Sequence, residues 1–139
     1  MIPETGDIEI YELTDDNLIA KCKEWQDDEC ICAVEDVSSS PQMGVKSAFS
    51  FGENFGFIKG VLRANAIPHE LVRPIKWKKA FSCQLGKDAT TKEKKEKDYT
   101  VAKMLFPDVD FRRTPKCKTP WYDAADALLI AEYIRRIRQ

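Results

Sequence analysis

The chain has 139 residues, 43% of them hydrophobic, and a formal net charge of -1. This length fits a single domain, residues 1–139, with enough apolar side chains for a core. No apolar run approaches the roughly 20 residues that span a bilayer, so we expect no membrane partner. Five cysteines without a secretion signal predict reduced thiols in a cytoplasm-like compartment.

The charges are divided unevenly between the two halves of the chain. Residues 1–72 carry 5 basic and 14 acidic side chains, a net charge of -9, whereas residues 73–139 carry 17 basic and 9 acidic ones, a net charge of +8. A basic half of this kind predicts a phosphate-binding surface. The alternative is that the charge runs are solvated faces, which is the better interpretation for any single lysine.

The first elements are predicted from hydrophobic periodicity. Residues 7–13 alternate polar and apolar side chains, which is typical of a half-buried strand. Thr14 and the two aspartates after it supply N-cap chemistry for an amphipathic helix over residues 17–26. Residues 30–35 form a continuous apolar run that ends in Glu35. Such a run predicts an interior strand that is covered on both sides.

A loop at residues 38–44 precedes a long predicted helix at residues 46–65. Small residues recur every four positions along this helix: Ala48, Gly52, Gly56, Gly60 and Ala64. Each helical glycine costs about 1 kcal/mol relative to alanine, so we expect another backbone to approach this stripe closely. The approaching element is either the protein's own sheet, which we favour, or a second subunit.

The second half of the chain is predicted to be mainly helical. Residues 67–74 read as a short strand between prolines, and Pro74 opens a helix over residues 75–82. A lysine-rich segment leads into a helix that ends at Phe106, before a proline. The last helix spans residues 122–138, with an apolar face formed by Leu128, Leu129, Tyr133, Ile134 and Ile137. Strands that alternate with helices predict one α/β layer structure.

Three carboxylates are the candidate catalytic and metal-binding residues. Asp123 and Asp126 are three residues apart, so they share one face of the last helix, and Glu35 ends the apolar strand. Carboxylates are ligands that Mg²⁺ prefers, and two such ions can activate water and stabilise the leaving oxygen in phosphodiester hydrolysis. The alternative is that Asp123 caps the helix and both aspartates only interact with its dipole.

The chain resembles the RuvC-type Holliday junction resolvases, particularly their phage-like members. The resemblance covers nearly the whole chain and rests on the order of five segments, which are residues 33–37, 47–60, 67–79, 102–108 and 123–133. It implies an RNase H-like mixed sheet flanked by helices, in a homodimer that cuts four-way DNA junctions with Mg²⁺ or Mn²⁺. It also implies a cytoplasmic location in a bacterial or phage-infected cell.

The resemblance assigns roles to individual residues. Glu35 becomes the inner-strand carboxylate, with Asp123 and Asp126 as the pair on the last helix. Lysines before that helix bind DNA phosphate, with Lys95 and Lys97 as the nearest matches. Other lysines that we name as phosphate-binding candidates are Lys92 and Lys46.

Two departures from the family pattern leave alternatives open. Family members begin with a strand that carries a fourth acid, and in this chain we expect that strand to be missing or truncated. Ser38 stands where relatives carry an aromatic junction wedge, and either Met43, Phe49 or Phe51 substitutes for it or the wedge is absent. The alternatives to a junction endonuclease are a catalytically inactive dimeric module that binds branched DNA and a related nuclease that acts on RNA–DNA hybrids.

Overall fold

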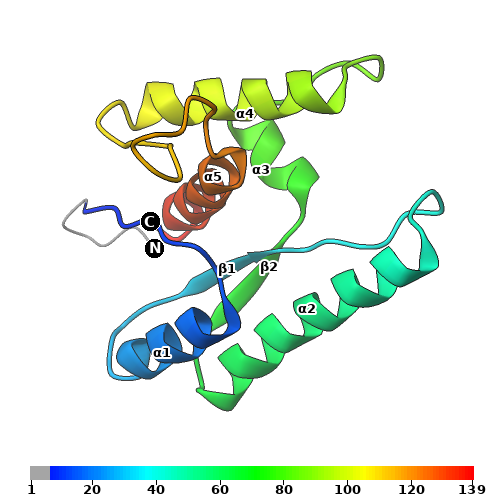
Figure 1. Cartoon of the computed structure of the whole chain (residues 1–139). Coiled ribbons are helices and arrows are strands. Elements are labelled where there is room, and N and C mark those ends of the chain that lie inside the picture. Colours follow the sequence, from blue (N-terminus) through cyan, green and yellow to red (C-terminus); the bar gives the residue numbers. More distant parts are fainter. Residues whose placement is uncertain (1–6) are drawn as a thin grey trace. The chain divides into compact units, whose positions relative to one another are not determined.

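The computed structural model describes residues 7–139 and has a mixed α/β structure (Figure 1). Its elements, in chain order, are α1 (Asp15–Trp25), β1 (Cys32–Glu35), α2 (Val45–Ala64), β2 (His69–Val72), α3 (Pro74–Ala80), α4 (Thr91–Leu105) and α5 (Tyr122–Ile137). The chain divides into two compact units. We call Tyr11–Leu71 the strand unit, and residues 7–10 with Val72–Gln139 the helical unit. The single-domain interpretation of residues 1–139 stays a prediction.

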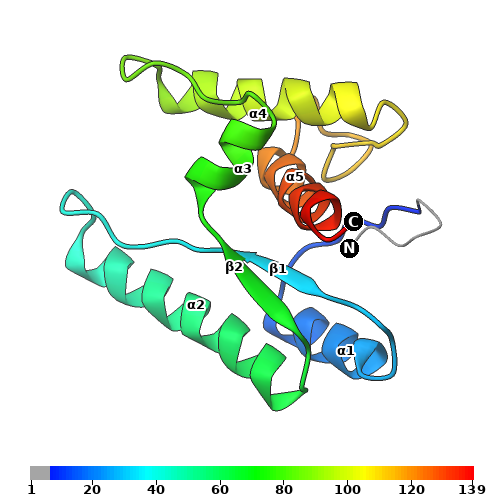
Figure 2. The ribbon, with the colours of Figure 1, turned by 180° about the vertical axis from the view of Figure 1, so that it is seen from behind.

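The strand unit is built on a β–α–β crossover. Strands β1 and β2 pair in a two-stranded parallel sheet, and α2 connects them. Helix α1 packs against α2 on one side of the strands (Figures 1 and 2). The buried core of this unit consists of Leu18, Cys22, Leu62 and Ile67. The α/β class is therefore confirmed. The Thr14 side chain also caps α1 as predicted, since it accepts a hydrogen bond from the backbone of Asn17 at 3.1 Å.

Two strand predictions are wrong. Residues 7–13 form neither helix nor strand, although their polar and apolar side chains alternate. Alternation makes a strand only where a partner strand offers hydrogen bonds, and the described sheet consists of β1 and β2 alone. Strand β1 is half-buried along its length, not buried on both faces. It lacks full cover because α1 and α2 lie on the same side of the strands.

The glycine stripe of α2 has no close neighbour in the described part of the chain. A Cβ atom built on Gly52, Gly56 or Gly60 has no other atom within 4 Å, apart from its own helix backbone and chain neighbours. The prediction that the protein's own sheet approaches the stripe is therefore wrong. The sheet instead receives the other side of the helix, where Phe57, Ile58 and Val61 join the core. An approach by a second subunit stays a prediction.

The helical unit is a packed group of three helices. Both α3 and α4 pack against α5, and the core contains buried side chains from all three and from the connecting segments. Its fully buried members include Trp77 and Leu129. Pro74 opens α3 as predicted. Along α5, Leu128, Leu129 and Ile134 are buried as predicted, but Ile137 is 55% exposed because the helix ends there. None of the described helices is long and apolar enough to cross a membrane.

Candidate functional site

The first turns of α5 carry the two candidate aspartates. Trp121 is the N-cap residue, and no side chain makes a capping hydrogen bond there. The alternative that Asp123 caps this helix is therefore wrong. Asp123 is exposed and has no hydrogen bond or ion pair among the described residues, while Asp126 is half-buried, with one carboxylate oxygen fully buried. Their spacing of three residues places them on the same helix face.

Buried alanines and leucines orient this face. Ala124 and Ala125 are buried between the two aspartates, and Leu128 and Leu129 continue the same buried side one turn later. Because these four side chains pack into the core, the helix cannot rotate without exposing them. The first residue of α5, Tyr122, also packs edge-to-face on Tyr99 of α4, with the ring centroids 6.1 Å apart. The start of α5 is therefore held firmly while Asp123 faces solvent.

Glu35 ends β1 in the strand unit, where it is half-buried. Asp123 and Asp126 belong to the helical unit. Within either unit, the described residues contain no group of three or more His, Cys, Asp or Glu that could hold a metal ion. The combination of Glu35 with the two aspartates thus stays a prediction, and α5 is the part of the candidate site whose geometry the structure defines.

The lysine candidates differ in how freely they reach solvent. On α4, Lys92 and Lys95 are exposed, and Lys97 is half-buried. Lys92 lies 4.0 Å from the Glu96 carboxylate, whereas Lys95 has no partner among the described residues. Lys46 is exposed in the first turn of α2, in the strand unit. Of the two lysines between which the sequence could not choose, Lys95 is therefore the more exposed to solvent.

A buried ion pair joins α3 to α4, and the sequence analysis missed it. Asp98 is 1% exposed, and its carboxylate accepts a hydrogen bond from Lys78 Nζ at 2.7 Å. The Cys83 thiol lies beside this pair, and burial together with the Asp98 charge raises its pKa to about 11. A signal was present in the sequence, because Asp98 shares a helix face with Ala102, four residues later. This pair fixes α3 on α4 and makes Asp98 a structural acid.

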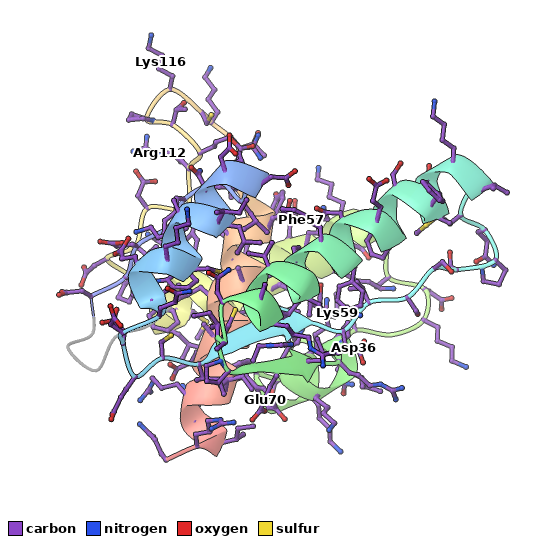
Figure 3. All side chains as sticks on the ribbon, turned by 90° about the horizontal axis from the view of Figure 1, so that it is seen from below. Asp36, Phe57, Lys59, Glu70, Arg112 and Lys116 are labelled. Atoms are coloured by element: carbon purple, nitrogen blue, oxygen red, sulfur yellow. The ribbon has the colours of Figure 1, made fainter. Side chains whose placement is uncertain are left out.

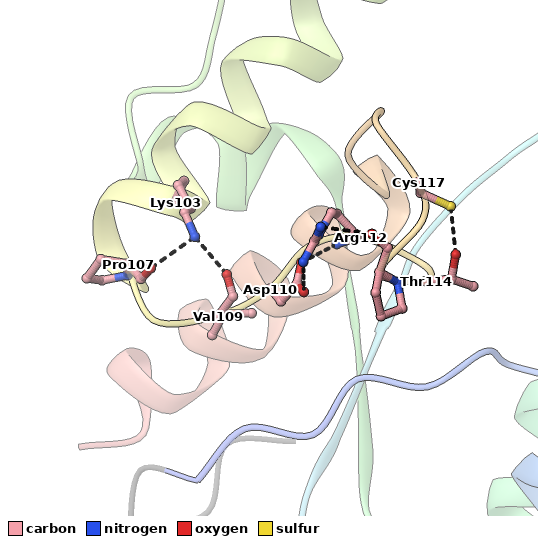
Figure 4. Close-up of polar contacts among 8 residues, drawn as sticks. Lys103, Pro107, Val109, Asp110, Arg112, Thr114 and Cys117 are labelled. Atoms are coloured by element: carbon pink, nitrogen blue, oxygen red, sulfur yellow. Dashed lines mark hydrogen bonds and ion pairs between the residues drawn. The ribbon is translucent and has the colours of Figure 1, made fainter.

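The loop between α4 and α5, residues 106–121, is held by its own polar side chains (Figure 4). Lys103 on α4 donates hydrogen bonds to the carbonyl oxygens of Pro107 at 2.9 Å and Val109 at 2.8 Å. Arg112 forms a bidentate pair with Asp110, with both N···O distances 2.9 Å. These hydrogen bonds hold the pKa of Asp110 at about 2. Sequence reasoning grouped these cations with the basic surface, but they have structural partners.

The three candidate junction wedges differ in accessibility. Phe49 in α2 is 74% exposed and Phe51 is 38% exposed, while Met43 is half-buried in the loop before the helix. An intercalating side chain must reach the stacked bases, so Phe49 is the best placed of the three.

No protein-family model matches this chain, and a search of curated proteins finds no match to it.

Proposed function

We propose that this protein is a metal-dependent endonuclease of the RuvC type, with an RNase H-like architecture, which cuts four-way DNA junctions as a homodimer. The observation that carries the proposal is the start of α5. There Asp123 is exposed and has no partner in the described part of the chain, and it shares a helix face with Asp126. Because Asp123 does not cap the helix, its position there is better explained by binding than by helix stability.

The donor set fits a divalent cation such as Mg²⁺ or Mn²⁺. Asp123 and Asp126 offer carboxylate oxygens from one face of a firmly packed helix, and Glu35 is the third ligand that the resemblance supplies. A bound ion of this kind lowers the pKa of a coordinated water and stabilises negative charge on the leaving oxygen. The chain itself holds the carboxylates in place, through the buried alanines and leucines on the opposite side of α5.

The basic side chains of α4 would bind the DNA backbone. Helix α4 packs against α5, so Lys92, Lys95 and Lys97 belong to the same unit as the two aspartates. Lys95 is exposed and has no partner among the described residues, which leaves its ammonium group available for a phosphate. Phosphate contacts of this kind position DNA and make its binding dependent on salt.

A catalytically inactive module that binds branched DNA is the second candidate. The observation that favours it is the charge of the segment 73–139, which is +8. Such a surface binds DNA without any metal. The two candidates differ in one outcome, which is strand cleavage when Mg²⁺ or Mn²⁺ is added.

The test is cleavage of a labelled four-way junction in Mg²⁺ and in Mn²⁺ by the full chain. The set of variants is the parent, Asp123→Asn, Asp126→Asn and Glu35→Gln, with Glu93→Gln on α4 as a control acid. We expect the parent and the Glu93 variant to nick the junction and the other three to lose activity. Junction binding without nicking would favour the binding module, and preferential cutting of an RNA–DNA hybrid would favour the related nuclease.

A further inference from the structure

The connection between α4 and α5 is long and irregular. It spans residues 106–121 and contains neither helix nor strand. Loops longer than roughly 12–15 residues without secondary structure are uncommon in compact domains, and they are usually functional or disordered. This loop has internal support, because Lys103 on α4 and Arg112 within the loop bind its backbone (Figure 4). A long loop that is held in shape by its own side chains is typical of a binding role.

The basic side chains of the loop fall into two classes. Those of the first class make contacts that hold the loop, and those of the second have no partner among the described residues. Arg112 belongs to the first class. Its guanidinium donates two hydrogen bonds to the Asp110 carboxylate and a third to the carbonyl of Pro115, at 3.0 Å. Arg113 also belongs to this class, because its guanidinium lies 4.8 Å from the centroid of the Trp121 ring. These contacts shape the loop and attach it to the N-cap residue of α5, two positions before Asp123.

Lys116 and Lys118 form the second class. Both are exposed, and neither has a hydrogen bond or ion pair among the described residues. Figure 3 shows Lys116 pointing outward from the tip of the loop. Residues 110–118 carry four basic side chains and one acid, which is Asp110 and is paired with Arg112. The free positive charge of the loop therefore lies mainly on the two lysines.

We propose that this loop is a second DNA-backbone contact, in which Lys116 and Lys118 each bind a phosphate of the strand. Lysine ammonium groups on flexible stems bind phosphates as point charges, whereas the Arg112 fork is already occupied by Asp110. The internal hydrogen bonds hold the loop in shape before DNA arrives, which reduces the entropy that binding would cost. The inference rests on the proposed function, because it takes DNA as the ligand.

A cavity beside the loop gives the phosphate contact room. Its volume is about 460 Å³, and its charged lining residues are Lys103, Asp108, Asp110, Arg112 and Lys118. This volume lies within the roughly 300–1,000 Å³ of small-ligand sites. Lys103 is bound to loop carbonyls and Arg112 is paired with Asp110, so Lys118 is the lining cation that keeps its charge available for a phosphate.

The first experiment measures binding of the metal-free full chain to a fluorescent four-way junction over a series of salt concentrations. The variant Lys116→Ala with Lys118→Ala should bind about tenfold more weakly, and its log–log salt slope should fall by about 2, roughly 1 for each lost phosphate contact. The matched control, Lys116→Arg with Lys118→Arg, keeps both charges and should bind like the parent. An unchanged slope in the alanine variant would overturn the loop assignment and leave the proposed function intact.

The second experiment uses Cys117 as a reporter inside the loop. Hydrogen bonds from Thr114 lower the pKa of the Cys117 thiol, and Arg113 and Arg112 add to this, whereas burial raises the pKa of the other four cysteines. Iodoacetamide near neutral pH should therefore alkylate Cys117 first, as read by mass spectrometry.

Saturating junction DNA should slow alkylation of Cys117 several-fold in the parent and in the arginine variant. Equal rates with and without bound junction would place DNA elsewhere and contradict the assignment. A parent chain that binds no DNA in either experiment would overturn the proposed function as well as the loop contact.

Discussion

Helices α4 and α5 begin in different ways. At α4, Thr90 accepts a hydrogen bond from the Glu93 backbone at 3.1 Å, and the Glu93 carboxylate accepts one from the Thr90 backbone at 2.9 Å, which completes a capping box. At α5, Trp121 offers no side-chain cap, and Asp123 has no partner among the described residues. Both starts contain an acid in the first turn, but only the acid of α4 has a structural partner.

This difference separates acids that stabilise the fold from acids that are available for chemistry. Glu93 binds its own helix, and Asp98 binds Lys78 in the core. Asp123 gains only a favourable interaction with the α5 dipole, which is worth a few tenths of a kcal/mol to about 1 kcal/mol. The comparison predicts that removing a partnered group of α4, such as Thr90 or Asp98, changes stability and that substitutions at the start of α5 change activity.

The largest expected effect is on catalysis. Asp123→Asn and Asp126→Asn should each lower the rate of junction cleavage in Mg²⁺ by more than about a hundredfold, since even the partners that only orient metal ligands cost 10- to 100-fold when mutated. Rates are measured under single-turnover conditions, with binding followed separately. Full activity in either variant would remove α5 from the active site.

The next effect is on stability. Asp98→Asn should lower the free energy of unfolding by about 2 kcal/mol, because it leaves the Lys78 ammonium without its buried partner, although Lys78 is 25% exposed. Urea denaturation measures this loss, and Lys95→Ala, which removes an exposed lysine of the same helix, serves as the control. Equal midpoints for the two variants would mean that the ion pair contributes nothing.

Smaller changes in stability are expected from substitutions at the two helix starts, which can be compared directly. Thr90→Ala removes the cap of α4 and should cost about 1 kcal/mol of stability. Asp123→Asn should cost only about 0.5 kcal/mol, because it removes a dipole interaction and no hydrogen bond. The two free energies come from denaturation under the same conditions. A larger loss for Asp123→Asn than for Thr90→Ala would reverse the comparison.

The smallest effect depends on pH. Arg112 lowers the pKa of Asp110 from 3.8 to about 2 in the folded chain. A lowered folded-state pKa stabilises the fold above the unfolded-state value, and this contribution is lost as the pH falls from about 4 towards 2. Denaturation of the parent and of Asp110→Asn should differ slightly above pH 5 and converge as the pH falls through about 2. A difference that stays constant with pH would contradict the ion pair.

The sequence predicted helices well because helix signals are local. Thr14 caps α1 and Pro74 opens α3, and both features can be read from a few neighbouring residues. The prediction of a strand at residues 7–13 was wrong because a strand also needs a partner strand, which the alternation of polar and apolar residues does not reveal. The prediction that the sheet approaches the glycine stripe was wrong for a similar reason, because the spacing of residues in α2 does not reveal which element lies opposite them.

The candidate site could be predicted only in part for a related reason. The i, i+3 spacing of Asp123 and Asp126 was visible, but the absence of a cap at α5 needed the structure. Likewise, Asp98 looked like one more charge in a solvated lysine run until α3 was seen to pack beside it. Its helical spacing to Ala102 was a local signal, but its partner Lys78 lies twenty residues away.

The proposed divalent metal site at the start of α5 can be tested directly. The most direct measurement is paramagnetic broadening of backbone amide signals of the full chain by substoichiometric Mn²⁺, with the start of α4 as the internal reference. We predict selective broadening at residues 122–127, lost in Asp123→Asn with Asp126→Asn, and none at residues 90–94. Equal broadening at both helix starts, or broadening that persists in the double variant, would contradict the proposed site.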